Sequence, residues 1–363
     1  MVSKPSTCAD PPLRPMRSWT GALRALLNHA GTRFALSAAL SALFLYLAFR
    51  GTDFPKLLQA LAEANYSWLL FSFCILILSH CVRAWRWRFL LDPIKTGIGL
   101  RNLFSGVMIG YFVNNGLPRV GELARPYTIA KLESISSSAA LGTVVVERIL
   151  DTFVFIALVF VIPLVYNGPL LESFPWLQDA GLIVSLVMLP LVAFPVILMI
   201  RRDWTDQLVR QMARFLPARL GERMKQMVHF FLDGFLFLMD PAATLKIFVM
   251  TIAIWGLYLL MMYAAFFGFG LNEQLGLRAA LVTLAISSIG VAIPTPGGTG
   301  TYHAFTSQTL MRLFAVDPTI ALSYATATHA VNFIGTTIIG LFFFLKDHTS
   351  LAEAVKGNTG EGQ

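Results

Sequence analysis

The chain has 363 residues, of which 56% are hydrophobic and only 13% are charged, and its mean hydropathy is +0.66. Soluble domains carry about 25% charged residues, so this composition excludes an ordinary soluble domain and predicts an all-α polytopic membrane protein. The net charge of +8 does not indicate a nucleic-acid partner, because Lys and Arg gather in short segments beside apolar runs. Cys8, Cys74 and Cys81 are odd in number, and two lie in an apolar run, so no disulfide framework is expected.

Six apolar runs are each long enough to cross a membrane as a helix. They cover residues 34–49, 67–90, 139–166, 180–200, 246–268 and 320–345. Basic clusters follow the second and fourth runs, and Lys346 follows the last, whereas the loop 167–179 contains no Lys or Arg. Because basic loops stay in the cytoplasm, we expect both termini to be cytoplasmic and the protein to lie in the inner membrane of a bacterium or archaeon.

The runs belong to one predicted transmembrane domain, residues 34–348. Residues 1–33 are basic and read as the cytoplasmic leader of an uncleaved signal-anchor, since no clear cleavage site follows the first run. Residues 349–363 read as a flexible cytoplasmic tail.

Two further apolar pieces, residues 102–117 and 279–293, each end in Pro and Gly. If both crossed the membrane fully, Arg125 and Lys131 would lie outside, against the positive-inside rule. We therefore predict two re-entrant helical hairpins. Irregular backbone at membrane depth is tolerated only where protein or a water-filled cavity covers it.

The order of these segments predicts an inverted-topology repeat, with residues 67–166 as repeat one and residues 246–345 as repeat two. Corresponding positions keep a nearly constant offset: Pro118 and Pro296 are 178 residues apart, and Ala139 and Ala321 are 182 apart. Inverted repeats place binding sites near the membrane midplane, between broken helices.

Between the repeats, residues 201–240 carry apolar residues at helical spacing, with arginines on the opposite face. This pattern predicts an elbow of amphipathic helices, broken at Pro217, on the cytoplasmic surface. A plain connector is the alternative.

Three charged residues, Glu147, Arg148 and Asp151, fall inside the third run or at its cytoplasmic edge. A charge at the centre of a membrane helix costs about 2.5–3.5 kcal/mol on insertion scales. Glu147 and Asp151 share a helical face, and Arg148 and Asp151 are spaced to pair. A structural ion pair near the interface is one explanation; the other is a polar path for a lipid headgroup or a coupling proton.

The segment NNGLPRVGELARP at 114–126 supplies the next candidates. Arg119 and Arg125 suit phosphate, since guanidinium binds phosphate with two parallel hydrogen bonds, and the peptide N–H groups around Gly116 and Gly121 can add donors. Ordinary cytoplasmic positive charge is the alternative explanation for these arginines.

The segment PTPGGTGTYH at 294–303 is the second Pro/Gly interruption, and its glycines permit sharp turns and close backbone approach. His329 and Asn332 lie in the last run, although a membrane histidine often only hydrogen-bonds a neighbouring helix. The expected substrate path comprises Asn115, Pro118, Arg119, Gly121, Glu122, Arg125, Glu147, Arg148, Asp151, Pro296, Gly297, Gly298, Gly300, His329 and Asn332.

An interfacial belt is predicted where the second run ends, with aromatic rings at the lipid headgroups and arginines toward water. It consists of Arg83, Trp85, Arg86, Trp87 and Arg88. Such a belt also suits anionic lipid.

Common enzyme motifs are missing from the sequence: there is no GxxxxGK, HExxH, CxxC or GxSxG. We therefore expect no cofactor, no metal site and no catalytic residue.

Four motifs together, RAWRWRFLL at 83–91, NNGLPRVGELARP at 114–126, VVVERILD at 144–151 and PTPGGTGTYH at 294–303, resemble the lysylphosphatidylglycerol synthase transmembrane-region family. The resemblance to these flippase-like membrane proteins covers nearly the whole chain after the first thirty residues. The family pattern falls on Arg86, Trp87, Asn115, Pro118, Gly121, Glu122, Arg125, Glu147, Arg148, Asp151, Pro296, Gly297, Gly298 and Gly300.

The resemblance implies movement of a lipid between leaflets, which is the role of the membrane part where relatives carry a cytosolic aminoacyl-lipid synthase domain. These 363 residues contain no such domain, so we do not expect the chain to make lysylphosphatidylglycerol. Many relatives carry an acidic residue after the second glycine segment, where this chain has Thr301, Tyr302 and His303, which argues against a symmetric pair of carboxylates.

The leading functional hypothesis is translocation of an anionic phospholipid or polyprenyl-linked lipid, with membrane lipids as partners. Two alternatives stay open: an accessory subunit that scaffolds a lipid-modifying or glycan-assembling enzyme, and an intramembrane transferase acting on lipid-linked sugar.

Overall fold

A computed structural model describes residues 30–166 and 240–347, with a few isolated positions between these ranges. Every regular element in the described ranges is helical, which confirms the predicted all-α class. The elements are α2 (Ala30–Phe49), α3 (Phe54–Glu63), α4 (Tyr66–Leu91), α5 (Leu100–Gly116), α6 (Gly121–Glu133), α7 (Ser137–Val165), α12 (Pro241–Phe267), η2 (Leu271–Glu273), α13 (Leu277–Ala292), η3 (Pro296–Gly298), α14 (Thr301–Phe314) and α15 (Pro318–Lys346).

Four described helices are long and apolar enough to cross a membrane, namely α4, α7, α12 and α15. They match four of the six predicted spans. The first predicted span lies in α2, which with α3 forms a fifth candidate bent by 90°; α2 begins inside the segment predicted as leader. The predicted span 180–200 and the predicted elbow 201–240 lie outside the described residues, apart from isolated positions.

Each of the four long helices begins at a side chain that caps it. Asn65, Ser136, Asp240 and Asp317 precede α4, α7, α12 and α15, and each accepts a hydrogen bond from a backbone N–H of the first turn. Short polar side chains at this position satisfy N–H groups that have no partner inside the helix. The starts of the long helices are therefore encoded locally.

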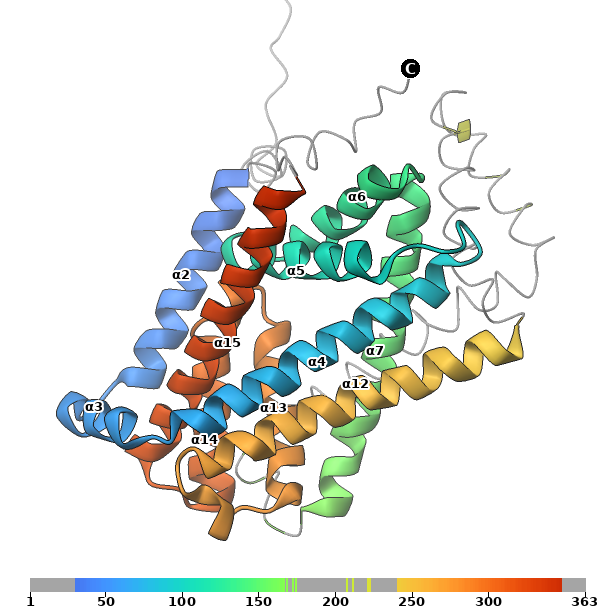
Figure 1. The fold of residues 1–363 in the computed structure, drawn as a ribbon. Coiled ribbons are helices and arrows are strands. Elements are labelled where there is room, and N and C mark those ends of the chain that lie inside the picture. Colours follow the sequence, from blue (N-terminus) through green and yellow to red (C-terminus); the bar gives the residue numbers. More distant parts are fainter. Residues whose placement is uncertain are drawn as a thin grey trace, which may run out of the picture.

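The two halves of the fold repeat one order of elements. Helices α4, α5, α6 and α7 have 26, 17, 13 and 29 residues, and helices α12, α13, α14 and α15 have 27, 16, 14 and 29. In each half, two short helices pack as a hairpin between two long ones (Figure 1). Helices α5 and α13 occupy the two pieces predicted as hairpins, residues 102–117 and 279–293, and the returning helices α6 and α14 follow them.

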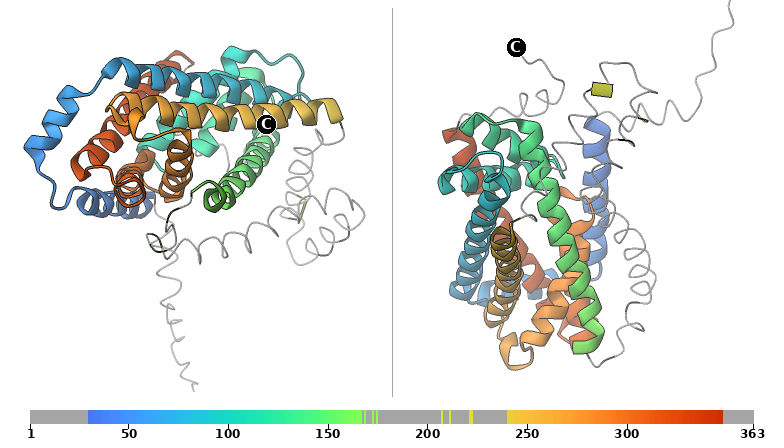
Figure 2. Two further views of the ribbon diagram at one scale, coloured as in Figure 1. Left: turned by 90° about the horizontal axis from the view of Figure 1, so that it is seen from below. Right: turned by 90° about the vertical axis from the view of Figure 1, so that its right-hand side faces the viewer.

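The packing between the halves is also paired. Helices α4 and α12 lie side by side along much of their length (Figures 1 and 2). Helix α5 packs against α15 of the other half, and α13 correspondingly packs against α7. The α5–α6 hairpin lies toward the end of the molecule where α2 begins and α15 ends, and the α13–α14 hairpin lies toward the opposite end (Figure 1).

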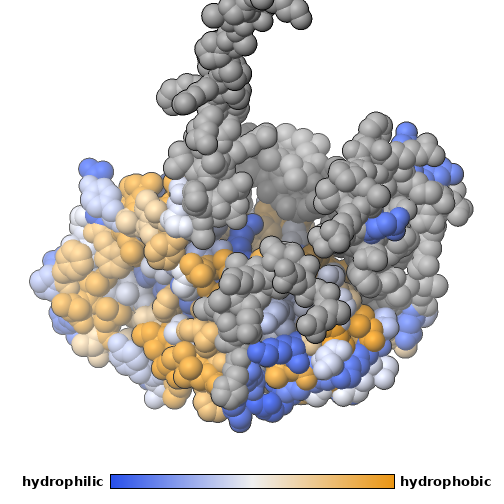
Figure 3. Space-filling view, turned by 90° about the horizontal axis from the view of Figure 1, so that it is seen from above, coloured by the Kyte–Doolittle hydropathy of each residue, from blue (hydrophilic) through white to orange (hydrophobic). Residues whose placement is uncertain are grey.

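Large apolar side chains cover much of the outer surface, as the space-filling view shows for the described residues on one side (Figure 3). Leu70 on α4, Phe248 on α12 and Leu345 on α15 are 60%, 62% and 63% exposed. Extended apolar surface of this kind suits contact with lipid rather than water.

The α5–α6 hairpin is closed by a backbone contact that only glycine permits. A Cβ atom on Gly121 would overlap the Gly110 carbonyl oxygen and lie 2.7 Å from the Asn114 side chain. The Gly121 N–H donates to Asn114 Oδ1 at 2.7 Å. The second hairpin has a similar contact, since a Cβ on Gly290 would lie 3.0 Å from the Thr301 carbonyl oxygen.

We predict that Gly121→Ala destabilises the protein by about 3 kcal/mol or more, because the added methyl group meets backbone that cannot move aside, and overpacking costs about 1–3 kcal/mol even where side chains can adjust. Gly116→Ala is the matched control, since a Cβ there meets nothing within 4 Å. Thermal unfolding in detergent, followed by gel filtration, measures both. Equal melting temperatures for the two variants would contradict the close hairpin contact.

Candidate anion-binding site

Two carboxylates lie buried one helical turn apart on α7. Glu147 is 0% exposed and Asp151 is 8% exposed. Removing a charge from water is costly unless opposite charges and hydrogen bonds compensate. The side chains around this pair must therefore supply the compensation.

Arginines from three helices supply it. Arg83 of α4 donates from Nη1 to Glu147 at 2.6 Å and to Asp151 at 2.7 Å. Arg125 of α6 binds Glu147 through both terminal nitrogens, at 2.7 and 2.8 Å. Arg148 of α7 donates to Glu147 at 2.8 Å and lies 3.5 Å from Asp151, as its spacing predicts.

A fourth arginine ties the site to the second half of the fold. Arg86 of α4 donates from Nη1 to Asp151 at 2.7 Å and to Thr251 of α12 at 2.9 Å. Arg83 also donates to the hydroxyl of Tyr258 on α12 at 2.9 Å. We call Glu147, Asp151 and these four arginines the charge cluster; it joins α4, α6, α7 and α12.

The prediction of an interfacial belt is wrong for three of its five residues. Arg83, Arg86 and Trp87 are 4%, 0% and 0% exposed, so the two arginines point into the protein rather than toward water. Buried carboxylates on α7 attract them more strongly than the interface does. Trp87 donates to Thr143 at 2.8 Å and stacks under the Arg125 guanidinium at 3.9 Å. Trp85 is exposed and Arg88 is half-buried.

The charge cluster holds more positive than negative charge. Its buried members are three arginines, Arg83, Arg86 and Arg125, and two carboxylates, Glu147 and Asp151. Arg148 adds a further positive charge, and nearby Glu122, whose side chain is 34% exposed, lies 3.7 Å from it. One positive charge therefore stays uncompensated among the described residues.

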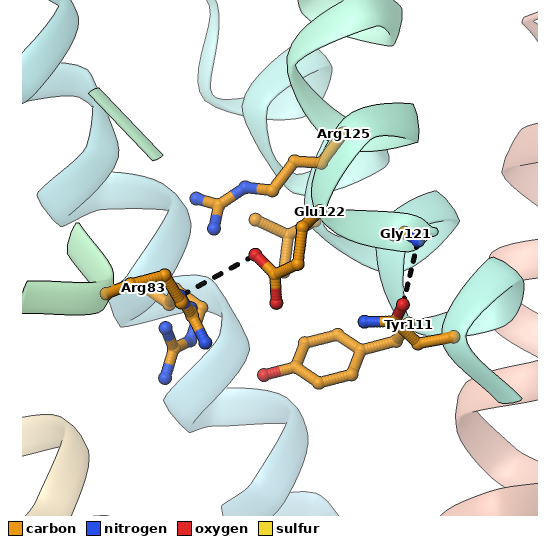
Figure 4. Close-up of a pocket in the computed structure, with 9 residues that line it drawn as sticks. Arg83, Tyr111, Gly121, Glu122 and Arg125 are labelled. Atoms are coloured by element: carbon orange, nitrogen blue, oxygen red, sulfur yellow. Dashed lines mark hydrogen bonds and ion pairs between the residues drawn. The ribbon is translucent and has the colours of Figure 1, made fainter. Parts of the chain in front are cut away.

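A small cavity of about 30 Å³ opens beside this excess charge. Figure 4 shows Arg83, Glu122 and Arg125 converging on it from α4 and α6, with Tyr111 of α5 below them. Its lining comprises Arg83, Val107, Gly110, Tyr111, Asn114, Gly121, Glu122, Arg125 and Arg148. The Nε atoms of three of these, Arg83, Arg125 and Arg148, are buried and donate no hydrogen bond to the described residues, and that of Arg148 lies 3.7 Å from a Glu122 oxygen.

Arg119, predicted as a phosphate ligand, does not line this cavity. Its guanidinium donates to the carbonyl oxygen of Ala292 at the end of α13, at 2.9 Å. Pro118 lies beside it in the turn between α5 and α6. Arg119 therefore links the first Pro/Gly segment to the second hairpin.

The two Pro/Gly segments meet at the end of α5. Asn115 donates to Thr337 at 2.9 Å and to the Phe333 carbonyl at 3.3 Å, both on α15. Its Oδ1 lies 2.9 Å from where a Cβ on Gly297 would stand. Asn115 therefore lies between the first Pro/Gly segment and the second.

The remaining predicted residues surround the second segment. His329 contacts the carbonyl oxygen of Gly297 through Nε2 at 3.0 Å, and Asn332 lies 3.9 Å from the sulfur of Met261. Pro296 and Gly298 form η3 with Gly297. Gly300 has a φ of 86°, and a Cβ there would lie 2.5 Å from a backbone oxygen of α2. These residues do not line the cavity at the charge cluster.

An ion pair outside the spans fixes the far end of α6. Lys95 donates to Glu133 at 2.8 Å and Asn102 donates to the same carboxyl at 2.7 Å. Burial alone would raise the pKa of Glu133, but these hydrogen bonds outweigh it and hold the pKa below its usual value. The α4–α5 connection is thereby fastened to the hairpin.

Sequence reasoning missed Tyr111 and Asn114 as lining residues, and it misplaced Arg83 and Arg86. A charge inside a membrane helix is costly, so arginines in an apolar helix require buried partners, just as Glu147 does. The same argument, applied to α4, predicts that Arg83 and Arg86 pair with the carboxylates of α7. Tyr111 and Asn114 carry no comparable signal, because neutral polar residues are common at helix ends.

The family model described as the lysylphosphatidylglycerol synthase TM region matches residues 34–340 of the chain. The chain belongs to this family. It is a multi-pass membrane protein, as the four to five apolar span candidates also indicate.

Three archaeal relatives are named UPF0104 membrane proteins. One of Methanocaldococcus jannaschii is 33% identical over 130 residues, 34% of this chain but only 38% of that relative. One of Methanothermobacter thermautotrophicus is 27% identical over 257 residues, 67% of this chain and 74% of the relative. One of Pyrococcus horikoshii is 23% identical over 314 residues, 82% and 92% respectively. No solved structure matches the chain.

We predict that Glu147→Gln destabilises the protein by about 3–5 kcal/mol, because it leaves buried arginines without their shared carboxylate. Glu122→Gln removes a half-exposed carboxylate and should cost no more than about 1 kcal/mol. Thermal unfolding in detergent compares the two. A Glu147→Gln variant as stable as the Glu122→Gln variant would show that the charge cluster does not support the fold.

Proposed function

We propose that the protein is a flippase-like translocase that moves lipids with an anionic headgroup, phospholipid or polyprenyl-linked, between leaflets of the inner membrane. The observation that carries this proposal is the uncompensated positive charge of the cluster beside a cavity. An anion in the cavity would balance that charge.

The donors suit a phosphate group. The Nε atoms of Arg83 and Arg125 are buried without hydrogen bonds to described residues, and they belong to side chains that line one cavity. Charge-assisted hydrogen bonds between guanidinium and phosphate are short and strong. Leaving such donors unpaired in a buried site is costly, so binding a phosphate oxygen would recover free energy.

We propose that the headgroup moves from this cavity toward the second Pro/Gly segment. Asn114 lines the cavity, and its neighbour Asn115 contacts α15 and the region of Gly297. A headgroup leaving the arginines would next meet the amide of Asn115 and the backbone of η3. The meeting of the two Pro/Gly segments therefore supports a path for a polar headgroup.

Alternating access of two inverted repeats would move the headgroup along this route. The matching element order of the two halves and the antiparallel course of α4 and α12 support this mechanism (Figure 1). In that arrangement both hairpins are re-entrant, one from each side, and the termini are cytoplasmic.

Labelling of single cysteines with an impermeant thiol reagent tests the inverted arrangement. In a chain without Cys8, Cys74 and Cys81, Ser138→Cys at the start of α7 should react from the cytoplasmic side and Pro318→Cys at the start of α15 from outside. Both positions are exposed. Reaction of both from the same side would overturn the inverted repeat.

Leaflet exchange in proteoliposomes tests the translocase. Acyl-labelled phosphatidylglycerol, phosphatidylcholine and a polyprenyl phosphate serve as probes, with an impermeant quencher outside. We expect exchange of an anionic probe, slowed at least about tenfold by Arg148→Gln, since a hydrogen bond to a charged group contributes about 1.5–3 kcal/mol. Arg278→Gln, an equal charge change at an exposed position on α13, should exchange at the wild-type rate.

Three results would count against the proposal: no exchange of any probe, equal exchange of the neutral and anionic probes, or equal slowing by both variants. With no exchange of any probe, the accessory-subunit hypothesis would take its place.

A further inference from the structure

A second group of ionisable side chains lies in repeat two, where His303 of α14 meets His329 of α15. The matching glycine contacts of the two hairpins place Phe305 at the position of Arg125, so these histidines are not the counterpart of the Arg125–Glu147 pair. The two imidazole rings are in contact, with centroids 4.6 Å apart.

Hydrogen bonds fix which nitrogen of each ring carries hydrogen. The Gly300 N–H donates to Nδ1 of His303 at 3.3 Å, so that Nδ1 is bare and the hydrogen of a neutral ring is on Nε2. The Gly297 carbonyl can only accept, so Nε2 of His329, 3.0 Å away, must donate. Nδ1 of His329 then holds a free lone pair, and no described residue hydrogen-bonds it.

The His303–His329 pair can bind one additional proton, and that proton binds to His329. Protonation of His303 at Nδ1 would break the hydrogen bond from Gly300 at the start of α14. Protonation of His329 at Nδ1 leaves the bond to Gly297 in place and strengthens it, because the donor becomes charged. Two charged rings in contact would repel each other, so one proton excludes a second.

The surroundings contain no described carboxylate to balance that proton. Tyr302 of α14 lies beside both rings, at 5.7 Å from His329, Asn115 of α5 lies at Gly297, and Phe49 of α2 packs on His303. Helix α12 contributes Met262, which contacts Tyr302. A charged group near this end of α13, Arg119 on the Ala292 carbonyl, is also positive.

We infer that His329 is a proton-binding site that takes up one proton together with the anionic headgroup, so that lipid and proton move as a neutral pair. This inference rests on the proposed translocase function. The proton comes from water on the loading side, forms an N–H bond at Nδ1, and returns to water on the other side; no other bond changes. The headgroup supplies the negative charge that the second segment lacks.

Glu147 is excluded from this role by its contacts, although the sequence made it a candidate for a coupling proton. Its carboxylate accepts hydrogen bonds from Arg83, Arg125 and Arg148, and a proton there would oppose all three. The two halves therefore have different roles. The fixed positive charge of repeat one attracts the anion, and the His329 ring of repeat two binds the proton that moves with it.

Anion binding and protonation at His329 must then strengthen each other equally, as linkage requires. The first experiment observes protonation directly, by ¹⁵N-histidine NMR of the protein in nanodiscs. His329→Gln and His303→Gln assign the signals, and glutamine at 329 can still donate to the Gly297 carbonyl. We expect His329 to gain a proton at a higher pH in phosphatidylglycerol than in phosphatidylcholine. Inorganic phosphate added to phosphatidylcholine nanodiscs shows whether a free anion suffices.

The second experiment imposes a pH gradient on proteoliposomes and measures the leaflet distribution of labelled phosphatidylglycerol. One proton per anionic lipid predicts about a tenfold leaflet ratio for each pH unit. His329→Gln should leave the ratio near one while exchange continues, and Arg278→Gln should keep the wild-type ratio.

The outcomes separate this inference from the proposed function. Exchange of the anionic probe with a ratio near one at every gradient overturns the proton site and leaves the translocase intact. Absence of exchange overturns the translocase, and the NMR arm then decides: an anion-dependent proton on His329 supports the site, and its absence removes it.

Discussion

The fold depends on two carboxylates that cannot remain buried alone. Glu147 and Asp151 lie on one face of α7, and the arginines that neutralise them come from α4, α6 and α7 itself. Because an uncompensated buried charge is so costly, these helices must come together in one register. The same requirement draws α12 into the cluster through Thr251 and Tyr258.

The buried arginines outnumber the buried carboxylates, and this excess positive charge is the main property of the site. Three fully or almost fully buried arginines serve two carboxylates, so the protein holds a standing positive charge within its apolar surroundings. Among the described residues, the second half of the fold shows no counterpart of this cluster. The fold thus places a charged cluster in its first half and, in our proposal, a histidine that takes up a proton in its second half.

Much of the architecture is readable from the sequence because membrane helices are long apolar runs. Four spans and the short apolar helices α5 and α13 follow from hydropathy and from the Pro/Gly interruptions. The partners of Glu147 do not follow as easily: Arg83 and Arg86 sit in a Trp-Arg sequence that resembles an interfacial belt, and only the rotation of α4 decides whether they face lipid or protein. That rotation is set by packing against α12, which leaves little mark on the sequence of α4.

The cavity was hidden for a related reason. Gly110 and Gly121 bring α5 and α6 into backbone contact, and this approach creates the space that Tyr111 and Asn114 line. Sequence identifies the glycines as permissive positions but not which backbone comes near them. Arg119 was misjudged similarly, since its partner, the Ala292 carbonyl, lies 173 residues away.

Asn114 and Asn115 give the last turn of α5 an unusual mechanical position. One amide holds the Gly121 N–H at the edge of the first cavity, and the next reaches α15 beside η3. Consecutive residues on a helix move as a rigid unit, so a rotation of this single turn cannot loosen one contact without straining the other. The last turn of α5 therefore couples the first cavity mechanically to the contact with α15, in addition to the other links between the two halves.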